Sequence, residues 1–511
     1  MAQAPGEPFL IFDDVAWWDE PPEPTPKPAP PPRRPRPRHQ TRTFAGDLAR
    51  LEEALAARGP RPFALAAALV AVVALVAVAR VALTGEEPAP QTAPAPQGQS
   101  AGQPPAPPPR AAPIRTVAPG DRGPAVRDLQ AALAALGLYG SAPDASFGEG
   151  TGAAVSAFQR DRGLVVDGVA GPTTVTALLD AVAERAAVDA SVVEGGLADA
   201  VAGGRLPQAE ASRYGEIVAN AATALSALRP GRSATVGAVL HDIAAHADSY
   251  DGPRALALFT MLATNAEYLA GRPLPDGRLD IEDVDGVVYR FFPAHGFQFH
   301  PLANFARLNG LVRKEDRDGA QRLARALVAR AVPSGRALTW EYYFPFQGPS
   351  RWTSGLAQAA GAQALARSGA WLGDAALVRR ARGAYRAIPA GLSRELGGGL
   401  WIREYGFADT AILNAQLQSI VSLSEYVEVS GDEGARAVVT RMATAARALL
   451  HEFDTGCWSR YSLDGAPAST TYHTYHVSLL RQLARRTGEA LWSETGTRWN
   501  GYLRASSCTT T

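Results

Sequence analysis

The chain has few of the residues that mark metalloproteins, disulfide-rich proteins or nucleic-acid-binding proteins. It carries only two cysteines, Cys457 and Cys508, which excludes a disulfide framework and leaves open a single bridge between them. No Cys/His spacing matches a zinc site, and no cluster indicates a metal ion or a cofactor. Lysine occurs only at Lys27 and Lys314, and the formal net charge is zero. The overall charge therefore gives no indication of nucleic-acid binding.

One long uncharged apolar run is present, FALAAALVAVVALVAVA at residues 63–79. About 20 such residues span a bilayer, and Arg80 near the end can extend toward the headgroups. We therefore expect a single transmembrane helix over residues 63–83, with a buried soluble helix as the alternative. Arginines are concentrated before the run, and TGEEPAP follows it, so the positive-inside rule puts residues 1–62 in the cytoplasm. The expected location is the cell membrane, single-pass, with the catalytic part extracytoplasmic.

Proline-rich segments flank this run. Residues 1–62 form a Pro/Arg-rich tail, with EPPEPTPKPAPPPRRPRPR at residues 20–38, which we expect to be disordered or in polyproline II conformation. Residues 84–113 are rich in Pro, Ala, Gln and Gly, a composition typical of a spacer. Neither segment is expected to contain a folded domain.

Residues 114–182 have the pattern of a small three-helix domain. Apolar residues recur at helical spacing in PGDRGPAVRDLQAALAALGLY and again in FGEGTGAAVSAFQRDRGL, and VDGVAGPTTVTALLDA places Pro172 near the start of a third helix. The succession G-D-x-G-x-x-V-x-x-L-Q, F-G-x-x-T, A-V-x-x-F-Q and D-G-x-x-G-P-x-T resembles the peptidoglycan-binding domain of wall hydrolases. This resemblance implies a wall-anchoring module without catalysis of its own; the alternative is a module used for protein contacts.

From about residue 190 to 505 the chain alternates helical patterns with aromatic-rich loops. Several helical runs begin near Asp and end at Gly, as capped helices do. The loops contain FFPAHGFQFHP, WEYYFPFQGPSRW, ELGGGLWIREYG and CWSRYSLDGAPASTTYHTYH. Helix pairs with aromatic loops at one rim predict an α/α toroid-like domain, an incomplete α/α barrel. The whole chain is therefore expected to be mainly α, with a transmembrane helix, a three-helix wall-binding domain and a toroid-like catalytic domain.

Three of these segments resemble a known family in order and spacing. GLWIREYGFADTAILNAQLQSIVSLSEY, HEFDTGCWSRYSLDG and STTYHTYHVSLLRQLARRTGEALWSETGTRWNGYL are similar to the C-terminal domain of D-glucuronyl C5-epimerases, over roughly residues 285–503. The segment RWTSGLAQAAGAQALAR resembles the W-x-S-x-x-A-Q helix of the same domain. The family inverts C5 of glucuronate within a polymer to give iduronate, so the resemblance implies a uronate-containing polysaccharide as substrate.

The resemblance also assigns site residues. Removing the weakly acidic C5 hydrogen requires proton-transfer groups on both faces of the sugar and neutralisation of its carboxylate. By their place in the family's motifs, the catalytic candidates are Glu404, Tyr405, Tyr461 and Tyr472. Cations can lower a phenol's pKa and hold a carboxylate, and aromatic rings can stack on sugars. The substrate-binding candidates are Tyr343, Trp352, Gln358, Trp401, Arg403, Arg460, His473 and His476, the last with a structural role as the alternative.

Two departures from the family pattern affect expected substrate contacts, so the resemblance does not imply a heparan-type substrate. The Asp-Leu-Arg that commonly follows the tyrosine of the third motif is replaced by Ser462, Leu463 and Asp464, and Gly406 replaces a proline after Glu-Tyr. Three other functions stay open: a polysaccharide lyase, which shares the C5 proton abstraction; a glycan-binding scaffold without catalysis; and a glycosidase using Glu404 and Asp454.

Overall fold

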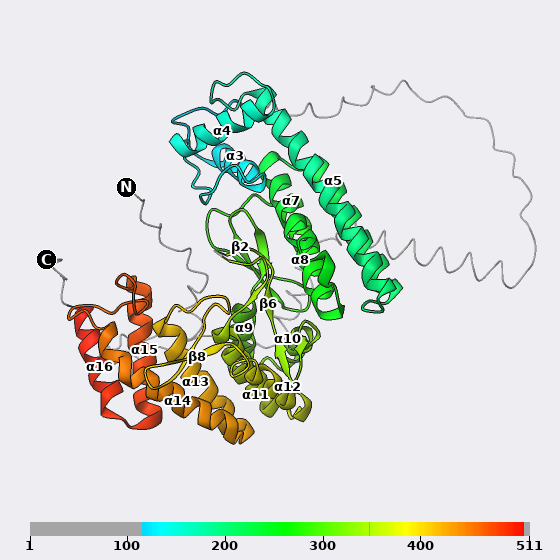
Figure 1. Ribbon diagram of the computed structural model, residues 1–511. Coiled ribbons are helices and arrows are strands. Elements are labelled where there is room, and N and C mark those ends of the chain that lie inside the picture. The colour runs from blue at the N-terminus through cyan, green and yellow to red at the C-terminus, as the bar shows by residue number, and fades with distance from the viewer. Residues whose placement is uncertain (1–114, 347, 505–511) are drawn as a thin grey trace, which may run out of the picture. The chain divides into compact units, whose positions relative to one another are not determined.

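The computed structural model describes residues 115–346 and 348–504, and within them the chain is mainly helical (Figure 1). The predicted fold class is wrong on one point. No helix in this described part is long and apolar enough to cross a membrane. The longest, α5 (Pro172–Ala202), carries Asp180, Glu184 and Arg185, which are costly in a bilayer. The segment predicted to span, residues 63–83, lies outside the described residues, as do the tail at 1–62 and most of the linker at 84–113.

The first three described helices form the small module expected from the sequence. They are α3 (Pro124–Ala135), α4 (Glu149–Asp161) and the first turns of α5, and they enclose a core that includes Val126, Leu133, Val155 and Phe158. A buried glutamine secures each connection: the Gln130 amide donates to the Ser146 carbonyl, and the Gln159 amide donates to that of Val169. These two glutamines satisfy loop carbonyl groups that would otherwise be buried without a partner, which helps about 60 residues to fold around a small core.

Helix α5 continues without a break beyond this module. Its later turns pack against α6 (Gln208–Ala227), α7 (Pro230–Ala244) and the short η2 (Ala247–Ser249). Helix α8 (Gly252–Gly271) packs on α6 and α7, and α3 of the module also lies against α7. The module and the α6–α8 layer are therefore joined by one helix and by a packed surface.

The remaining helices form pairs. The pairs are α9 (Pro301–Arg313) with α10 (Arg317–Ala329), α11 (Gly355–Leu372) with α12 (Ala375–Arg386), α13 (Leu413–Ser430) with α14 (Glu433–Leu449), and α15 (Thr470–Thr487) with α16 (Ala490–Tyr502). The first members touch in succession, α9 to α11 to α13 to α15. The caps expected at Asp are present at Asp374 and Asp432, each of which accepts a backbone N–H of its own helix's first turn. Ser354 and Ser469 cap α11 and α15 in the same way.

Most of the segments expected as aromatic loops are β-hairpins. The antiparallel strands are β1 (Asp280–Glu282), β2 (Val288–Phe292) and β3 (Gly296–Phe299) in one sheet, and the hairpins β4 (Val332–Ser334) with β5 (Ala337–Thr339), β6 (Glu341–Tyr342) with β7 (Trp352–Thr353), and β8 (Ser393–Leu396) with β9 (Gly399–Ile402). Gly397 and Gly398 both have positive φ, which gives β8–β9 the tight two-residue turn that matches strand twist. Aromatic residues favour such strands because their side chains pack on the pleated surface.

Candidate active site

The four catalytic candidates come together although they lie on three separate segments. Glu404 and Tyr405 directly follow β9, Tyr461 lies in the connection between η3 (Leu450–Phe453) and α15, and Tyr472 is in the first turn of α15. Backbone bonds hold these segments: Gly406 N–H donates to the Thr353 carbonyl, and Leu413 N–H donates to that of Tyr461. The fold therefore fixes the positions of these side chains through main-chain contacts.

Glu404 is the most unusual ionisable group of the cluster. Its side chain is 1% exposed, and within the described residues neither carboxylate oxygen has a hydrogen-bond partner. Burial raises the pKa of Glu404 to about 8, because the charged form loses its hydration without gaining a partner. At neutral pH the carboxyl group is therefore mostly protonated, and such shifts are common at catalytic positions.

The three tyrosines form a connected set beside Glu404. The phenols of Tyr405 and Tyr461 share a hydrogen bond, and the rings of Tyr461 and Tyr472 meet edge to face with centroids 4.8 Å apart. Burial, reinforced by the nearby Glu404 charge, raises the pKa of Tyr405 and of Tyr461 well above 10. The resting phenols of Tyr405 and Tyr461 are therefore protonated, although the sequence predicted neighbouring cations that would lower their pKa.

Aromatic rings surround Tyr405. Trp352 lies 5.7 Å from it between ring centroids and stacks on Tyr342 at 4.0 Å. Phe346 and Phe407 also lie against Tyr405, at 5.3 and 5.8 Å, and both are partly exposed. These two phenylalanines were not among the sequence candidates, although both lie inside quoted segments, Phe346 in WEYYFPFQGPSRW and Phe407 in GLWIREYGFADTAIL. Half-exposed rings beside a phenol pair suit the apolar face of a sugar.

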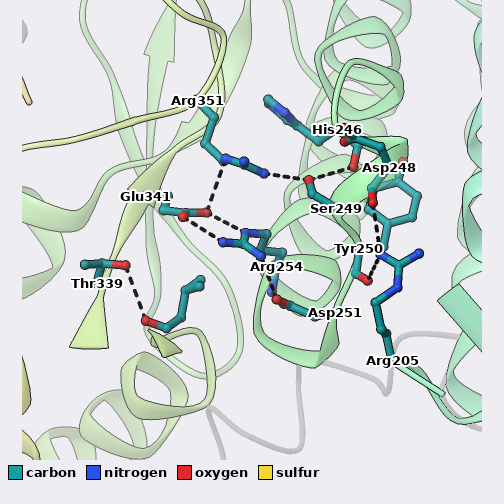
Figure 2. Close-up of polar contacts among 11 residues, drawn as sticks. Arg205, His246, Asp248, Ser249, Tyr250, Asp251, Arg254, Thr339, Glu341 and Arg351 are labelled. Carbon is teal, nitrogen blue, oxygen red and sulfur yellow. Dashed lines mark hydrogen bonds and ion pairs between the residues drawn. The ribbon is translucent and has the colours of Figure 1, made fainter. Parts of the chain in front are cut away.

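A polar network anchors the β6–β7 hairpin that carries Trp352 (Figure 2). The Arg254 guanidinium donates to both Glu341 carboxylate oxygens, at 2.8 and 3.1 Å, and to Asp251 at 2.7 Å. Figure 2 shows Arg351 between Glu341 and Ser249, to whose hydroxyl it donates at 2.6 Å. This network fastens β6 to η2 and to the start of α8, so it orients the aromatic hairpin.

Tyr343, a predicted sugar-binding residue, lies behind that hairpin. It is 1% exposed, packs edge to face on His246 at 5.7 Å, and has a pKa raised well above 10 by burial. Trp352 is also mostly buried, at 4% exposure, and its indole N–H donates to the Phe344 carbonyl. Both residues shape the surroundings of Tyr405 from within the core.

The two arginines expected to hold the sugar carboxylate are engaged elsewhere. Arg403 pairs with Asp409 at 2.8 Å and donates to the Gly391 carbonyl. Arg460 donates to the Gly465 carbonyl at 3.1 Å, across the turn that follows Tyr461. Neither arginine is among the groups that shift the pKa of Tyr405 or of Tyr461. In this structure they secure the loops that flank the tyrosines.

The two histidines of TTYHTYH are core residues of α15. The His473 Nδ1 accepts from the Ser459 N–H, so Nε2 carries the proton and donates to the Trp499 carbonyl at 2.9 Å. Its ring stacks on Trp458 at 3.8 Å, and burial lowers its pKa. His476 is fully buried, and burial lowers its pKa to about 3. Both rings are enclosed in the core and hydrogen-bonded within it: the His476 Nδ1 bonds the Ser459 hydroxyl at 2.9 Å.

Gln358 and Trp401 are likewise internal. The Gln358 side-chain amide, in its satisfied orientation, donates to the Leu338 carbonyl and accepts from the Trp340 N–H, both at 3.1 Å. Trp401 is fully buried on β9 and stacks on Phe453 at 5.6 Å. Of the twelve sequence candidates, the compact group with proton-transfer chemistry is thus Glu404 with the three tyrosines. Within the described residues no cluster of three or more His, Cys, Asp or Glu side chains has the arrangement of a metal site.

Comparison with known proteins confirms the two resemblances seen in the sequence. Residues 334–501 match the family model described as D-glucuronyl C5-epimerase C-terminus, and residues 122–178 match the model described as putative peptidoglycan binding domain. The four catalytic candidates all lie inside the first match. This part of the chain is therefore similar to the C-terminal portion of a carbohydrate epimerase family.

Individual relatives are distant. A D-glucuronyl C5-epimerase of Caenorhabditis elegans is 26% identical over 179 residues, which is 30% of this chain and 29% of that protein. The chain thus matches well under two thirds of that relative's length. A cellobiose 2-epimerase structure from Bacillus thermoamylovorans covers 50% of this chain and 71% of its own, at 10% identity and a TM-score of 0.35. That overlap is too low to carry an argument.

Proposed function

We propose that this protein is a uronate C5-epimerase that converts D-glucuronate to L-iduronate residues within a polysaccharide. The observation that carries the proposal is the cluster of Glu404, Tyr405, Tyr461 and Tyr472, which lies inside the region that matches the epimerase model. Glu404 and Tyr472 are buried, and Tyr405 and Tyr461 are half-buried. Three phenols in contact, beside one carboxyl group of raised pKa, give the site several proton carriers. Burial alone raises the pKa of Glu404, and among the described residues no second carboxylate contributes to that shift. A glycosidase would need an opposed carboxylate pair.

The proposed proton path runs through Tyr405, Tyr461 and Tyr472, which contact one another in succession. It starts at Glu404, which lies close enough for its charge to raise the pKa of Tyr405 and of Tyr461. An ionised Glu404 takes the proton of the Tyr405 hydroxyl, and the resulting phenolate removes the C5 hydrogen of the sugar. The electron pair left at C5 is delocalised into the uronate carboxyl group. Tyr472 then gives its proton to the opposite face of C5, and its phenolate is reprotonated from Glu404 through Tyr461 and Tyr405. Protons balance over one cycle, and the hydrogen bond that Tyr405 shares with Tyr461 stabilises the transient phenolate.

We further propose that the reaction takes place at a wall-linked or extracytoplasmic polysaccharide. The match of residues 122–178 to a peptidoglycan-binding model supports this placement. Peptidoglycan is therefore the expected second partner, held by the three-helix module.

The test is exchange at C5 in deuterated water. The full chain is incubated with heparosan and with other glucuronate polymers, and the products are followed by NMR. Deuterium at C5 together with iduronate signals, both lost in Glu404→Gln, is the expected result. An unsaturated uronate, seen by its ultraviolet absorbance, would make the protein a lyase. Binding without either product would leave a glycan-binding scaffold and overturn the proposal.

A further inference from the structure

A cavity of about 460 Å³ lies between the three-helix module and the epimerase-like part of the chain. On the module side it is lined by Tyr139 and Ser141, which belong to the connection after α3. On the other side it is lined by the turn between β2 and β3, which carries His295, and by the segment after β6, which ends at Phe346. The module thus supplies one wall of the cavity, and α5, α7, the turn between β2 and β3 and the segment after β6 supply the rest.

A chain of hydrogen bonds fixes the position of one cationic side chain of this cavity, Arg185. Arg185 of α5 contacts the Nε2 of His241 on α7 at 2.8 Å. Because arginine can only donate, Nε2 must accept, so the His241 proton is on Nδ1, which faces the Asp189 carboxylate at 3.1 Å. Arg185 also donates to the Ala135 carbonyl, and its side chain is 36% exposed. The guanidinium also lies 3.9 Å from an Asp189 carboxylate oxygen, and its exposed part faces the cavity edge.

The opposite wall presents a second nitrogen donor. The His295 Nδ1 bonds the Asp242 carboxylate at 3.0 Å, and the same oxygen accepts from the Gln298 amide at 3.2 Å. Within the described residues the other ring nitrogen, Nε2, has no hydrogen-bond partner. Burial opposes the charged ring, but the Asp242 carboxylate outweighs it and raises the pKa of His295. Since Nδ1 donates to Asp242, Nε2 donates to a ligand carboxylate in the protonated ring, the form that Asp242 favours.

Two further features connect this cavity with the tyrosine cluster. Phe346 lines the cavity and lies 5.3 Å from Tyr405, so one ring belongs to both places. Phe344, next along the same wall, lies 5.4 Å from His295 and 6.1 Å from Trp352. Ala294, in the turn that carries His295, has φ of +70°, a strained value for a residue with a Cβ. Such strain is typical of positions that a ligand site requires.

We propose that this cavity is a distal subsite for the polysaccharide, in which sugars several residues away from the reacting one rest against the module and give a carboxylate to Arg185 and His295. The inference rests on the proposed function for the identity of the ligand, an acidic glycan. It adds that the peptidoglycan-binding-like module forms part of the substrate groove. Aromatic walls with two nitrogen donors fit alternating apolar sugar faces and uronate carboxylates.

The test compares chain length. Tetrasaccharides and decasaccharides of heparosan are titrated into the full chain by calorimetry, and their C5 deuterium exchange is measured in parallel. Ser141→Trp fills the cavity from the module side, and His295→Gln removes the ring nitrogen. Thr173→Trp is the matched control, since it adds the same bulk to an exposed hydroxyl position of the module outside the cavity.

We expect the wild-type chain to bind the decasaccharide at least tenfold more tightly than the tetrasaccharide. This ratio should fall toward one in Ser141→Trp and in His295→Gln and persist in Thr173→Trp. Exchange without a length preference would leave the epimerase function standing and overturn the subsite. A length preference that Ser141→Trp abolishes, without any exchange, would support the subsite and refute the epimerase. If neither oligosaccharide binds, the subsite for acidic glycans is refuted.

Discussion

Tyr461 and Tyr472 meet edge to face, 4.8 Å apart between ring centroids, although one precedes α15 and the other lies in its first turn. The contact depends on Ser469, whose hydroxyl caps the helix by accepting the Tyr472 N–H. A short loop and one helix cap therefore set the distance between two of the proposed proton carriers.

Removal of the Tyr472 hydroxyl should abolish catalysis with little effect on folding. Tyr472→Phe keeps the ring contact with Tyr461 and deletes the proton donor for one face of C5. We expect a loss of at least 10²-fold in C5 exchange, the lower range for a general acid. The matched control is Tyr475→Phe, one turn later, which loses the hydrogen bond to Gln418 and about 1 kcal/mol of stability. Equal exchange rates in the two variants would contradict the assignment.

The pH dependence of activity should follow Glu404. Since its pKa is about 8 and its ionised form starts the proposed proton path, kcat/KM should rise with pH through about 8. Glu404→Gln should lose this limb together with nearly all exchange. The measurement is exchange on heparosan between pH 5.5 and 9.5. A rate that falls with pH across this range would show that the protonated carboxyl group is the active form.

The same carboxyl group should make the protein less stable as pH rises. The pKa of Glu404 is higher in the folded state than in the unfolded chain, so its contribution is fully present below about 4.5 and is lost toward 8. The slope is about 1.4 kcal/mol per pH unit inside this window. Urea unfolding at several pH values should show it in the wild type, and Glu404→Gln should flatten it. An unchanged slope in the variant would assign the effect to other groups.

His476 should have the opposite effect at low pH. Its folded-state pKa is about 3, below the ordinary 6.5, so the unfolded chain binds a proton first as pH falls. The free energy of unfolding should therefore decrease from pH 6.5 toward 3. His476→Phe, which cannot take up a proton, should reduce this loss in urea titrations. His451, which is exposed, provides the control: His451→Phe should keep the wild-type acid dependence.

Two neighbouring glycines of α5 should respond to alanine in opposite directions. A Cβ at Gly196 would meet the Ala247 backbone of η2 at 2.6 Å, so Gly196→Ala must push α5 away, at a cost of about 1–3 kcal/mol. Gly195 faces open space, and Gly195→Ala should stabilise the helix by about 0.5–1 kcal/mol. Thermal unfolding of both variants measures the difference. Similar melting temperatures would show that α5 does not dock closely on η2.

Sequence patterns were most informative where a residue's chemistry depends on its own motif. The module's apolar spacing at Val126, Leu133 and Phe158 predicted its core, and the Glu-Tyr pair with two later tyrosines predicted a set of side chains that the fold brings together. Both predictions depend on local periodicity and on the order of motifs, which can be read directly from the sequence.

The motifs did not predict which side chains are buried, because burial is a property of the assembled fold. The motifs that contain His473 and Trp401 predicted sugar binding for both residues. In the fold, the packing of α15 on α16 encloses His473, and that of β9 on α14 encloses Trp401. The segment STTYHTYH was expected in a loop, and Ser469 instead starts a helix there. The cavity beside His295 has no linear signal, since its walls are more than 150 residues apart along the chain.

Helix α5 has a mechanical consequence. Because it passes unbroken from the three-helix module into the α6–α8 layer, the module cannot swivel as it would on a flexible tether. A glycan bound to the module would therefore lie at a fixed distance and angle from the tyrosines. The position at which the module binds would then determine which sugar residues along a glycan reach the tyrosines.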